Sequence, residues 1–106
     1  MSRCSIIKDP DNTWYAYINW DSWFADQISK IGGTFTLTVS VWFPDSAISE
    51  EGTYFSDTTK QTAFFGSGGV DGTTYDLLNR ISYTSSTLGA QVFTEDRTIQ
   101  VTIKDK

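Results

Sequence analysis

The side chains that most enzymes use as nucleophiles and general bases are scarce in this sequence. It has no histidine and a single cysteine, Cys4. Without an imidazole, a serine or cysteine nucleophile has no usual base, and the common zinc sites cannot form. Cys4 has no second cysteine to pair with, so packing and backbone hydrogen bonds must stabilise the fold. The sequence therefore excludes serine and cysteine hydrolase triads and the usual zinc centres.

Carboxylates are the remaining groups that could carry acid–base chemistry or bind a metal ion. Two pairs are adjacent in the sequence, Glu50 with Glu51 and Glu95 with Asp96. Neighbouring side chains of a strand point apart, so such a pair is a poor arrangement for a glycosidase. The acidic turn at 9–12 offers oxygen ligands for calcium, but no loop has the spacing of a helix–loop–helix site. We predict that the protein is not an enzyme and holds no cofactor or metal, with loop-bound calcium as the alternative.

The charge balance argues against two classes of partner. The chain has 13 acidic and 8 basic residues, a formal net charge of −5, and no two basic residues are adjacent. Proteins that bind nucleic acid or anionic membranes carry clustered lysine and arginine. No apolar stretch approaches the roughly 20 residues that a membrane-spanning helix needs. We therefore expect neither nucleic acid nor membrane as a partner.

Three aromatic residues are the candidates for binding another protein: Trp42, Tyr15 and Tyr17. Strict alternation over 35–43 puts Trp42 on the face opposite a set of apolar residues that should face the core. That set is Phe35, Leu37, Val39, Val41 and Phe43. Large aromatic side chains are favoured at protein interfaces, so Trp42, with Tyr15 and Tyr17, is predicted to contact a partner. The alternative is that a helical turn around Trp23 covers these side chains.

Most of the chain alternates between apolar and polar residues with a period of two, which is typical of an all-β domain. Clusters of glycine, proline, aspartate and serine separate the alternating segments. The expected strands are 3–8, 13–20, 35–43, a weak edge strand around 53–55, 61–65, 73–84 and 98–104. A helix capped by Asp21 is expected over 21–28, and the Gly-Gly at 32–33 should end it. About seven strands with one short helical insertion predict a single antiparallel β-sandwich over 1–106.

Two strands carry further expectations about their faces. In 13–20 both faces bear aromatic residues, so both are expected to be at least partly covered. In 73–84, Tyr75 starts the strand directly after a glycine-bearing turn. This is where an immunoglobulin-like sandwich has a tyrosine corner, in which the hydroxyl bonds a nearby backbone group. The alternative is that Tyr75 is a core aromatic residue without this bond.

Short motifs follow one another in order through nearly the whole chain. They are Lys8-Asp9-Pro10-Asp11, Tyr17-Ile18-Asn19-Trp20 with Trp23, Ser67-Gly68-Gly69 through Gly72 to Tyr75, Asn79-Arg80-Ile81, and Asp96-Arg97-Thr98-Ile99. In this order they resemble the fiber-tail adaptor proteins, a family of small virion proteins of tailed phages and prophages. Two segments depart from the family pattern. The segment 41–60 has Trp-Phe-Pro-Asp-Ser and an acidic loop in place of a shorter run, and 85–95 is longer.

The resemblance implies an immunoglobulin-like fold and a non-enzymatic virion subunit that links the tail, or its connector, to tail fibres through protein–protein contacts. It also implies a location in the virion tail, several copies in a symmetric assembly, and production in the cytoplasm of the host bacterium. Trp20, Trp23 and Tyr75 are expected to be structural residues. The two departing segments are where partner choice would lie. A capsid decoration protein and a carbohydrate- or receptor-binding module are the alternative functions.

Overall fold

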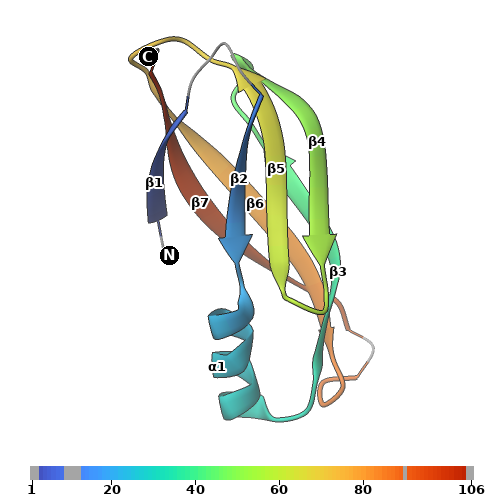
Figure 1. Ribbon diagram of the computed structural model, residues 1–106. Helices are drawn as coiled ribbons and strands as arrows, with labels where there is room; N and C mark the ends of the chain where they lie inside the picture. Colours follow the sequence, from blue (N-terminus) through green and yellow to red (C-terminus); the bar gives the residue numbers. More distant parts are fainter. Residues whose placement is uncertain (1–2, 9–12, 90, 105–106) are drawn as a thin grey trace.

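The computed structural model describes residues 3–8, 13–89 and 91–104, which form seven strands and one helix (Figure 1). The elements are β1 (Arg3–Lys8), β2 (Trp14–Asn19), α1 (Asp21–Ile31), β3 (Phe35–Phe43), β4 (Ile48–Ser56), β5 (Gln61–Gly68), β6 (Thr74–Ser85) and β7 (Phe93–Ile103). The predicted all-β architecture with one helical insertion is confirmed. The acidic turn at 9–12 lies outside the described residues, as does Ala90 in the expected 85–90 loop.

The strands form two sheets that pack face to face. One sheet has the order β1-β7-β6-β3 and the other β2-β5-β4. In immunoglobulin sandwiches, the second, fifth and fourth strands form one sheet, and the third, sixth and seventh belong to the other. The same division is found here. β1 runs parallel to β7, from Arg3 opposite Thr98 to Lys8 opposite Ile103. The sandwich is therefore immunoglobulin-like, with one parallel pair where the sequence predicted only antiparallel pairing.

The core lies between the sheets and takes one face of each strand. On β2, the buried residues alternate with Tyr15 and Tyr17, which are 55% and 59% exposed. The expectation that both faces of this strand are covered is therefore wrong. The buried apolar residues are Trp14, Ala16, Ile18, Trp20, Phe24, Phe35, Leu37, Trp42, Ile48, Phe64, Tyr75, Leu77, Ile81, Ile99, Val101 and Ile103. Burial of these large side chains supplies the main driving force for folding.

β3 departs most from its expected faces. Leu37 is buried as predicted, but the register against β6 shifts between Leu37 and Val39. This β-bulge adds Thr38 to one strand only, and a shift of one residue exchanges the faces of everything that follows. Trp42 is consequently buried, with its ring 5.6 Å from that of Phe64. The prediction that Trp42 faces solvent as a partner-binding residue is wrong.

The helix is longer than predicted and is capped differently. α1 has 11 residues, and Trp20, not Asp21, occupies the N-cap position. The side chain of Asn19 accepts a hydrogen bond from the backbone N–H of Asp21 at 2.9 Å, in place of a cap made by Asp21 itself. Gly32 ends the helix with φ of 84°, a left-handed conformation that glycine adopts without strain. Figure 1 shows α1 continuing from the end of β2, past the three-stranded sheet and beside the ends of β3 and β6.

Two strands extend well past their predicted bounds. The weak edge strand expected at 53–55 is the nine-residue β4, and β7 begins at Phe93, five positions before the predicted start at Thr98. Apart from Ile48, Gly52 and Phe93, the added residues are polar or charged. Backbone pairing with β5 and β6 stabilises these two extensions. Their side chains alternate too weakly for the sequence to predict a strand there.

Candidate functional site

A buried polar node at Trp20 joins the two sheets. Trp20 Nε1 donates to Oδ1 of Asn79 at 3.1 Å, and the hydroxyl of Thr62 donates to the same oxygen at 2.7 Å. Asn79 Nδ2 in turn donates to the Ser40 hydroxyl and the Val41 carbonyl, each at 3.0 Å. Trp20, Thr62 and Asn79 are fully buried. One asparagine thus connects β6 to β3 and to the opposite sheet.

Segments that carry the family resemblance meet at this node. The guanidinium of Arg97 lies 4.5 Å from the centre of the Trp20 ring, and its Nη1 donates to the backbone carbonyl of Asn19 at 3.4 Å. The ring of Trp23 meets Trp20 edge-on at 5.9 Å. Asn79, Arg97 and Trp23 therefore form packing contacts around Trp20.

Tyr75 makes the tyrosine-corner bond. The backbone N–H of Val70 donates to the Tyr75 hydroxyl at 3.0 Å, five residues upstream and across the turn that enters β6. Gly69 in this turn has φ of 95°, and a Cβ there would lie 2.6 Å from Ile103 Cγ1. Glycine therefore allows the turn to approach β7 closely, and the bond fixes the crossover between the sheets.

An aromatic cluster fixes α1 against the end of the four-stranded sheet. The ring of Tyr83 on β6 lies 5.2 Å from Trp23, 5.6 Å from Phe24 and 5.9 Å from Phe35, measured between ring centroids. Burial, and then the nearby carboxylate of Glu95, raises the pKa of the Tyr83 hydroxyl above its ordinary value. Tyr83 therefore stays neutral near neutral pH and acts as a packing residue.

The outer side of the three-stranded sheet carries an exposed aromatic surface, which we call the tyrosine face: Tyr15, Tyr17, Tyr54 and Phe65. In the register of β2, β5 and β4, Tyr15 lies opposite Phe65, while Tyr17 and Tyr54 both lie opposite Ala63. The rings of Tyr15 and Tyr17 are stacked 6.5 Å apart, and Phe65 lies 6.4 Å from Tyr15. The small Ala63 lies between Tyr17 and Tyr54 in the register of the sheet.

Sequence reasoning identified two of the four residues on the tyrosine face. Tyr54 is 60% exposed and Phe65 is 38% exposed, but neither was predicted as a binding residue. Phe65 follows the buried Phe64 directly, so alternation could not say which of the two faces the core. Knowledge of the pairing between β5 and β2 would have shown that Phe65 faces outward, because Tyr15 and Phe65 are partners across the strands.

The bulge in β3 creates a second apolar surface on the opposite side of the sandwich, which we call the valine face: Val39, Val41 and Phe43. These side chains are between 42% and 48% exposed. Phe43 packs under the guanidinium of Arg80, which lies 5.3 Å from the ring centroid. The residues expected to fill the core on this half of β3 therefore point to solvent.

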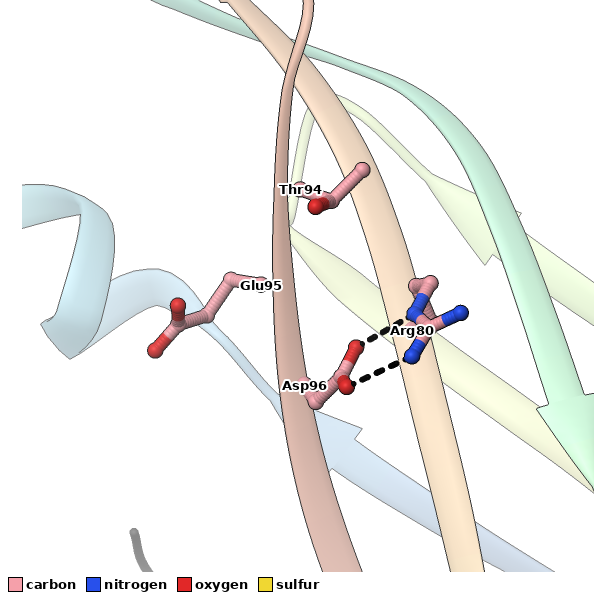
Figure 2. A pocket seen from close by; sticks show the side chains of 4 residues that line it. All are labelled: Arg80, Thr94, Glu95 and Asp96. Carbon is pink, nitrogen blue, oxygen red and sulfur yellow. Dashed lines mark hydrogen bonds and ion pairs between the residues drawn. The ribbon is translucent and has the colours of Figure 1, made fainter.

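Arg80 belongs to a bidentate ion pair at the edge of the valine face (Figure 2). Its Nε and Nη2 donate to the two carboxylate oxygens of Asp96 at 2.7 and 2.9 Å. The hydrogen bonds from Arg80 lower the pKa of the Asp96 carboxyl, and those to Asp96 raise the pKa of Arg80. Thr94 and Glu95 complete the wall of an open hollow of about 490 Å³. Figure 2 shows Glu95 pointing away from Asp96, so the two carboxylates do not converge on a common point.

The carboxylate of Asp57 accepts a hydrogen bond from a backbone N–H beside the bulge in β3. Its Oδ1 accepts the N–H of Leu37 at 2.7 Å and the ammonium of Lys60 at 2.8 Å. The bond from Lys60, followed by the bond from Leu37, lowers the pKa of this carboxyl below its ordinary value. Asp57 therefore supports the strand that presents the valine face.

No metal centre or membrane segment emerges from the part of the chain that the structure describes. Those residues contain no group of three or more histidine, cysteine, aspartate or glutamate side chains placed to hold a metal ion. Over the same residues, no helix has the length and apolar content to span a bilayer.

Glu51, one of the adjacent carboxylates considered for acid–base chemistry, accepts a hydrogen bond from the Ser67 hydroxyl at 2.7 Å.

Comparison with known proteins gives one match. The family model described as podophage GP4 fiber-tail adaptor protein gp77 matches residues 8–102. No curated protein and no solved structure matches the chain. The family description indicates a structural tail adaptor in the virion tail that contacts other tail and fibre proteins, and it points away from an enzyme. Because the match covers the helix and the strands from β2 to β7, the chain belongs to the podophage GP4 fiber-tail adaptor (gp77) family.

Proposed function

We propose that this chain is a single-domain adaptor that joins a tail or connector protein to a tail fibre by docking the two outer faces of its sandwich. The observation that carries the proposal is the tyrosine face, where Tyr15, Tyr17 and Tyr54 are each more than half exposed. An adaptor needs two separate contact surfaces, and the valine face lies on the other sheet. The two faces can therefore engage different neighbours at the same time.

The composition of both faces suits protein contacts. Tyrosine and phenylalanine bring a large apolar area at a low cost in side-chain entropy, and interfaces are rich in them. Each half-exposed ring that becomes covered removes on the order of 100 Å² of surface from water, which contributes roughly 2 kcal/mol. Arg80 adds a cation that Asp96 already holds in place, so little of its freedom is lost on binding.

The residues on these faces replace Trp42 in the proposal, because Trp42 is buried. Tyr54, Val41 and Phe43 all fall within 41–60, one of the two segments that depart from the family pattern. Segment 85–95 leads into the start of β7, beside the Arg80–Asp96 pair. We therefore assign partner choice to these two segments. Several copies around a symmetric tail, and synthesis in the host cytoplasm before assembly, complete the proposal.

Paired substitutions in the phage test this role. Replacing Tyr15 and Tyr17 together with serine should leave the domain folded and reduce the amount of the protein, or of the fibre, in purified particles. Val70→Ser is a matched control, because Val70 is 58% exposed in the turn before β6 and belongs neither to the two faces nor to the two segments assigned to partner choice. Particles of normal composition from the Tyr15/Tyr17 variant would contradict docking through the tyrosine face.

Glycan binding is the second candidate, and the same rings favour it. Exposed aromatic rings on a flat sheet can stack on the apolar faces of sugars, and the Tyr15–Tyr17 pair offers two such rings 6.5 Å apart. A glycan array with the purified protein separates the candidates. Binding that Tyr17→Ser abolishes would support a carbohydrate-binding module, and binding to no glycan would leave the protein-docking role.

A further inference from the structure

β4 is the last strand of the three-stranded sheet, and the side of it away from β5 is open (Figure 1). Its residues pair with β5 from Ile48 opposite Gly68 to Ser56 opposite Gln61. Within the described residues, no strand pairs with β4 on its other side. The positions outside the described residues adjoin β1, β2, the loop before β7 and the end of β7, and none of these elements pairs with β4. We call the open side of this strand the β4 edge.

The half of β4 that follows its bulge offers a regular backbone for pairing. The register against β5 shifts between Glu50 and Gly52, and from Gly52 to Ser56 each residue again has one partner. Alternate residues of an edge strand direct their N–H and C=O groups to the open side, where an added strand can bond to them. These five residues correspond to about 17 Å of extended chain.

The core-facing side of this half is incompletely covered. Phe55 lies opposite Thr62, which is fully buried, and directly opposite residues of two paired strands share one face of the sheet. Phe55 therefore faces the interior of the sandwich, yet it is 38% exposed. Thr53, opposite the fully buried Phe64, is also exposed. An added strand would cover Phe55 if its inward side chains were apolar.

The side chains near the start of the β4 edge are acidic. Glu50 and Glu51 are both exposed, and neither makes an ion pair in the described part of the chain. The carboxylate of Glu51 accepts a hydrogen bond from Ser67, which shares the outer side of β5 with Phe65, so this charge lies on the outer side of the sheet. Outward side chains of an added strand would therefore be favoured if they were basic.

No basic side chain on this edge offsets these carboxylates. The sequences of β3, β4 and β5 contain no lysine or arginine. Lys60 follows in the turn after β4 and is bound to Asp57, and Arg80 on β6 is bound to both oxygens of Asp96. Each of these ion pairs is neutral as a whole. The net charge beside the β4 edge is therefore negative.

We propose that the β4 edge accepts an extended segment of a partner protein in which apolar residues alternate with lysine or arginine. The segment adds a strand to the sheet beside β4, with its apolar side chains against Phe55 and its basic ones on the outer side near Glu51. Main-chain hydrogen bonds supply affinity, and the two sets of side chains supply specificity. The inference goes beyond docking through the two outer faces, because it concerns a sheet edge and can hold or fail independently.

A second copy of this chain is a less favourable occupant. Its β4 would bring Glu50 and Glu51, and no basic residue, to an edge that already carries the same two carboxylates. Like charges brought together across a strand pair destabilise it, and charged residues and bulges commonly protect edge strands from pairing with another copy. A basic segment turns the same charges into an attraction.

Binding of a synthetic peptide tests the proposal. The probe is a fluorescein-labelled Lys-Val-Lys-Val-Lys-Val-Lys peptide, measured by fluorescence anisotropy against the full chain. It should bind, and peptides with glutamate in place of lysine or serine in place of valine should not. Glu50→Lys should weaken binding about tenfold, since it reverses a charge at the edge. Asp76→Lys is the matched control, an exposed strand carboxylate in the other sheet, and should leave binding unchanged.

A second pair of variants locates the apolar contact. Phe55→Ser should weaken binding about tenfold, because the valine side chains lose the ring that they cover. Phe65→Ser is its control, since Phe65 is also 38% exposed but lies on the outer side of the central strand. Urea denaturation shows whether both variants are folded, and Glu50→Lys tests the edge without altering an apolar residue.

Two further measurements separate strand addition from simple charge attraction. N-methylation of the lysine residues and N-methylation of the valine residues remove N–H groups that point to opposite sides of the peptide strand, so only one of the two should abolish binding. Backbone amides within Gly52–Ser56 should also become protected from hydrogen exchange when the peptide binds.

Four results would overturn the proposal. The first is no binding at about 1 mM peptide, a concentration that detects binding free energies as weak as about −4 kcal/mol. The others are equal tolerance of both methylated peptides, a loss of binding in Phe65→Ser but not in Phe55→Ser, and dimerisation of the free chain that protects the same amides. None of these results bears on Tyr15 and Tyr17 in the virion, so failure here leaves the adaptor proposal to its own test.

Discussion

The indole N–H of Trp20 donates a hydrogen bond of 3.1 Å to Oδ1 of Asn79, which lies 59 positions away in the chain and in the opposite sheet. Most of the core around this bond is apolar. Asn79 also accepts from Thr62 and donates to Ser40. A fully satisfied buried network of this kind fixes how the sheets sit on each other, and hence how the two outer faces are oriented.

Replacing Asn79 with leucine should lower the free energy of unfolding by about 2–4 kcal/mol, because the buried Thr62 hydroxyl loses its acceptor and the indole N–H of Trp20 keeps only the 3.2 Å bond to Thr62 Oγ1. Urea denaturation of the purified protein measures this. Thr62→Val removes one hydroxyl and leaves the Trp20–Asn79 bond, so its cost should be about 1 kcal/mol. An Asn79→Leu variant as stable as Thr62→Val would show that the node does not hold the sheets together.

Tyr75→Phe removes only the hydroxyl that accepts the N–H of Val70. Loss of this bond leaves a part-buried backbone donor without its partner and should reduce the free energy of unfolding by about 1–2 kcal/mol. Tyr54→Phe makes the same chemical change on the exposed tyrosine face and should change stability by less than about 0.5 kcal/mol. Equal effects of the two substitutions would contradict the tyrosine corner.

The bulge in β3 makes opposite predictions for two neighbouring residues. Trp42→Ala should cost about 3–5 kcal/mol of unfolding free energy, since the ring is buried against Phe64. Phe43→Ala should cost less than about 1 kcal/mol, since that ring is 48% exposed. Strict alternation from Phe35 predicts the reverse order. Thermal unfolding of both variants distinguishes the two arrangements.

Asp57 should make stability depend on pH in the acidic range. Its folded pKa lies below the ordinary value of 3.8 because the hydrogen bonds from Lys60 and Leu37 favour the carboxylate. The stabilisation is therefore fully present above the unfolded pKa and is lost as the pH falls through the lower folded pKa. The side chain is about half exposed, so solvent screening limits its contribution to roughly 1 kcal/mol or less.

Asp57→Asn should therefore be less stable than the parent protein near neutral pH, and the difference should shrink as the pH falls from about 6 to about 2. Unfolding midpoints across this range measure the difference. A constant difference at all pH values would mean that the carboxylate charge contributes nothing at the bulge.

Sequence patterns predicted the elements of this fold better than the faces of its strands. Alternation located every strand and the inward sets Leu77 with Ile81 and Ile99 with Val101, because each strand has one clearly apolar face. It failed on β3, where a single inserted residue turns Val39, Val41 and Phe43 outward and Trp42 inward. A backbone bulge leaves no side-chain signature when the residue involved is an ordinary threonine.

The prediction of the candidate binding surfaces was limited in the same way. Tyr15 and Tyr17 were predicted as large aromatic residues that share one face of a strongly alternating strand, whereas Tyr54 lies in an edge strand of weak pattern. The partial pairing of β7 could not be predicted, because β1 and β7 are distant in the chain and their parallel register depends on tertiary packing. Strand pairing of this range is set by the whole fold and not by local sequence.

A high-resolution map of the intact parent virion is the decisive test of the adaptor role. We expect this chain at the junction of tail and fibre, with the rings of Tyr15 and Tyr17 covered by a neighbouring subunit. A map in which the chain is absent, decorates the head, or leaves both tyrosines in solvent would contradict it.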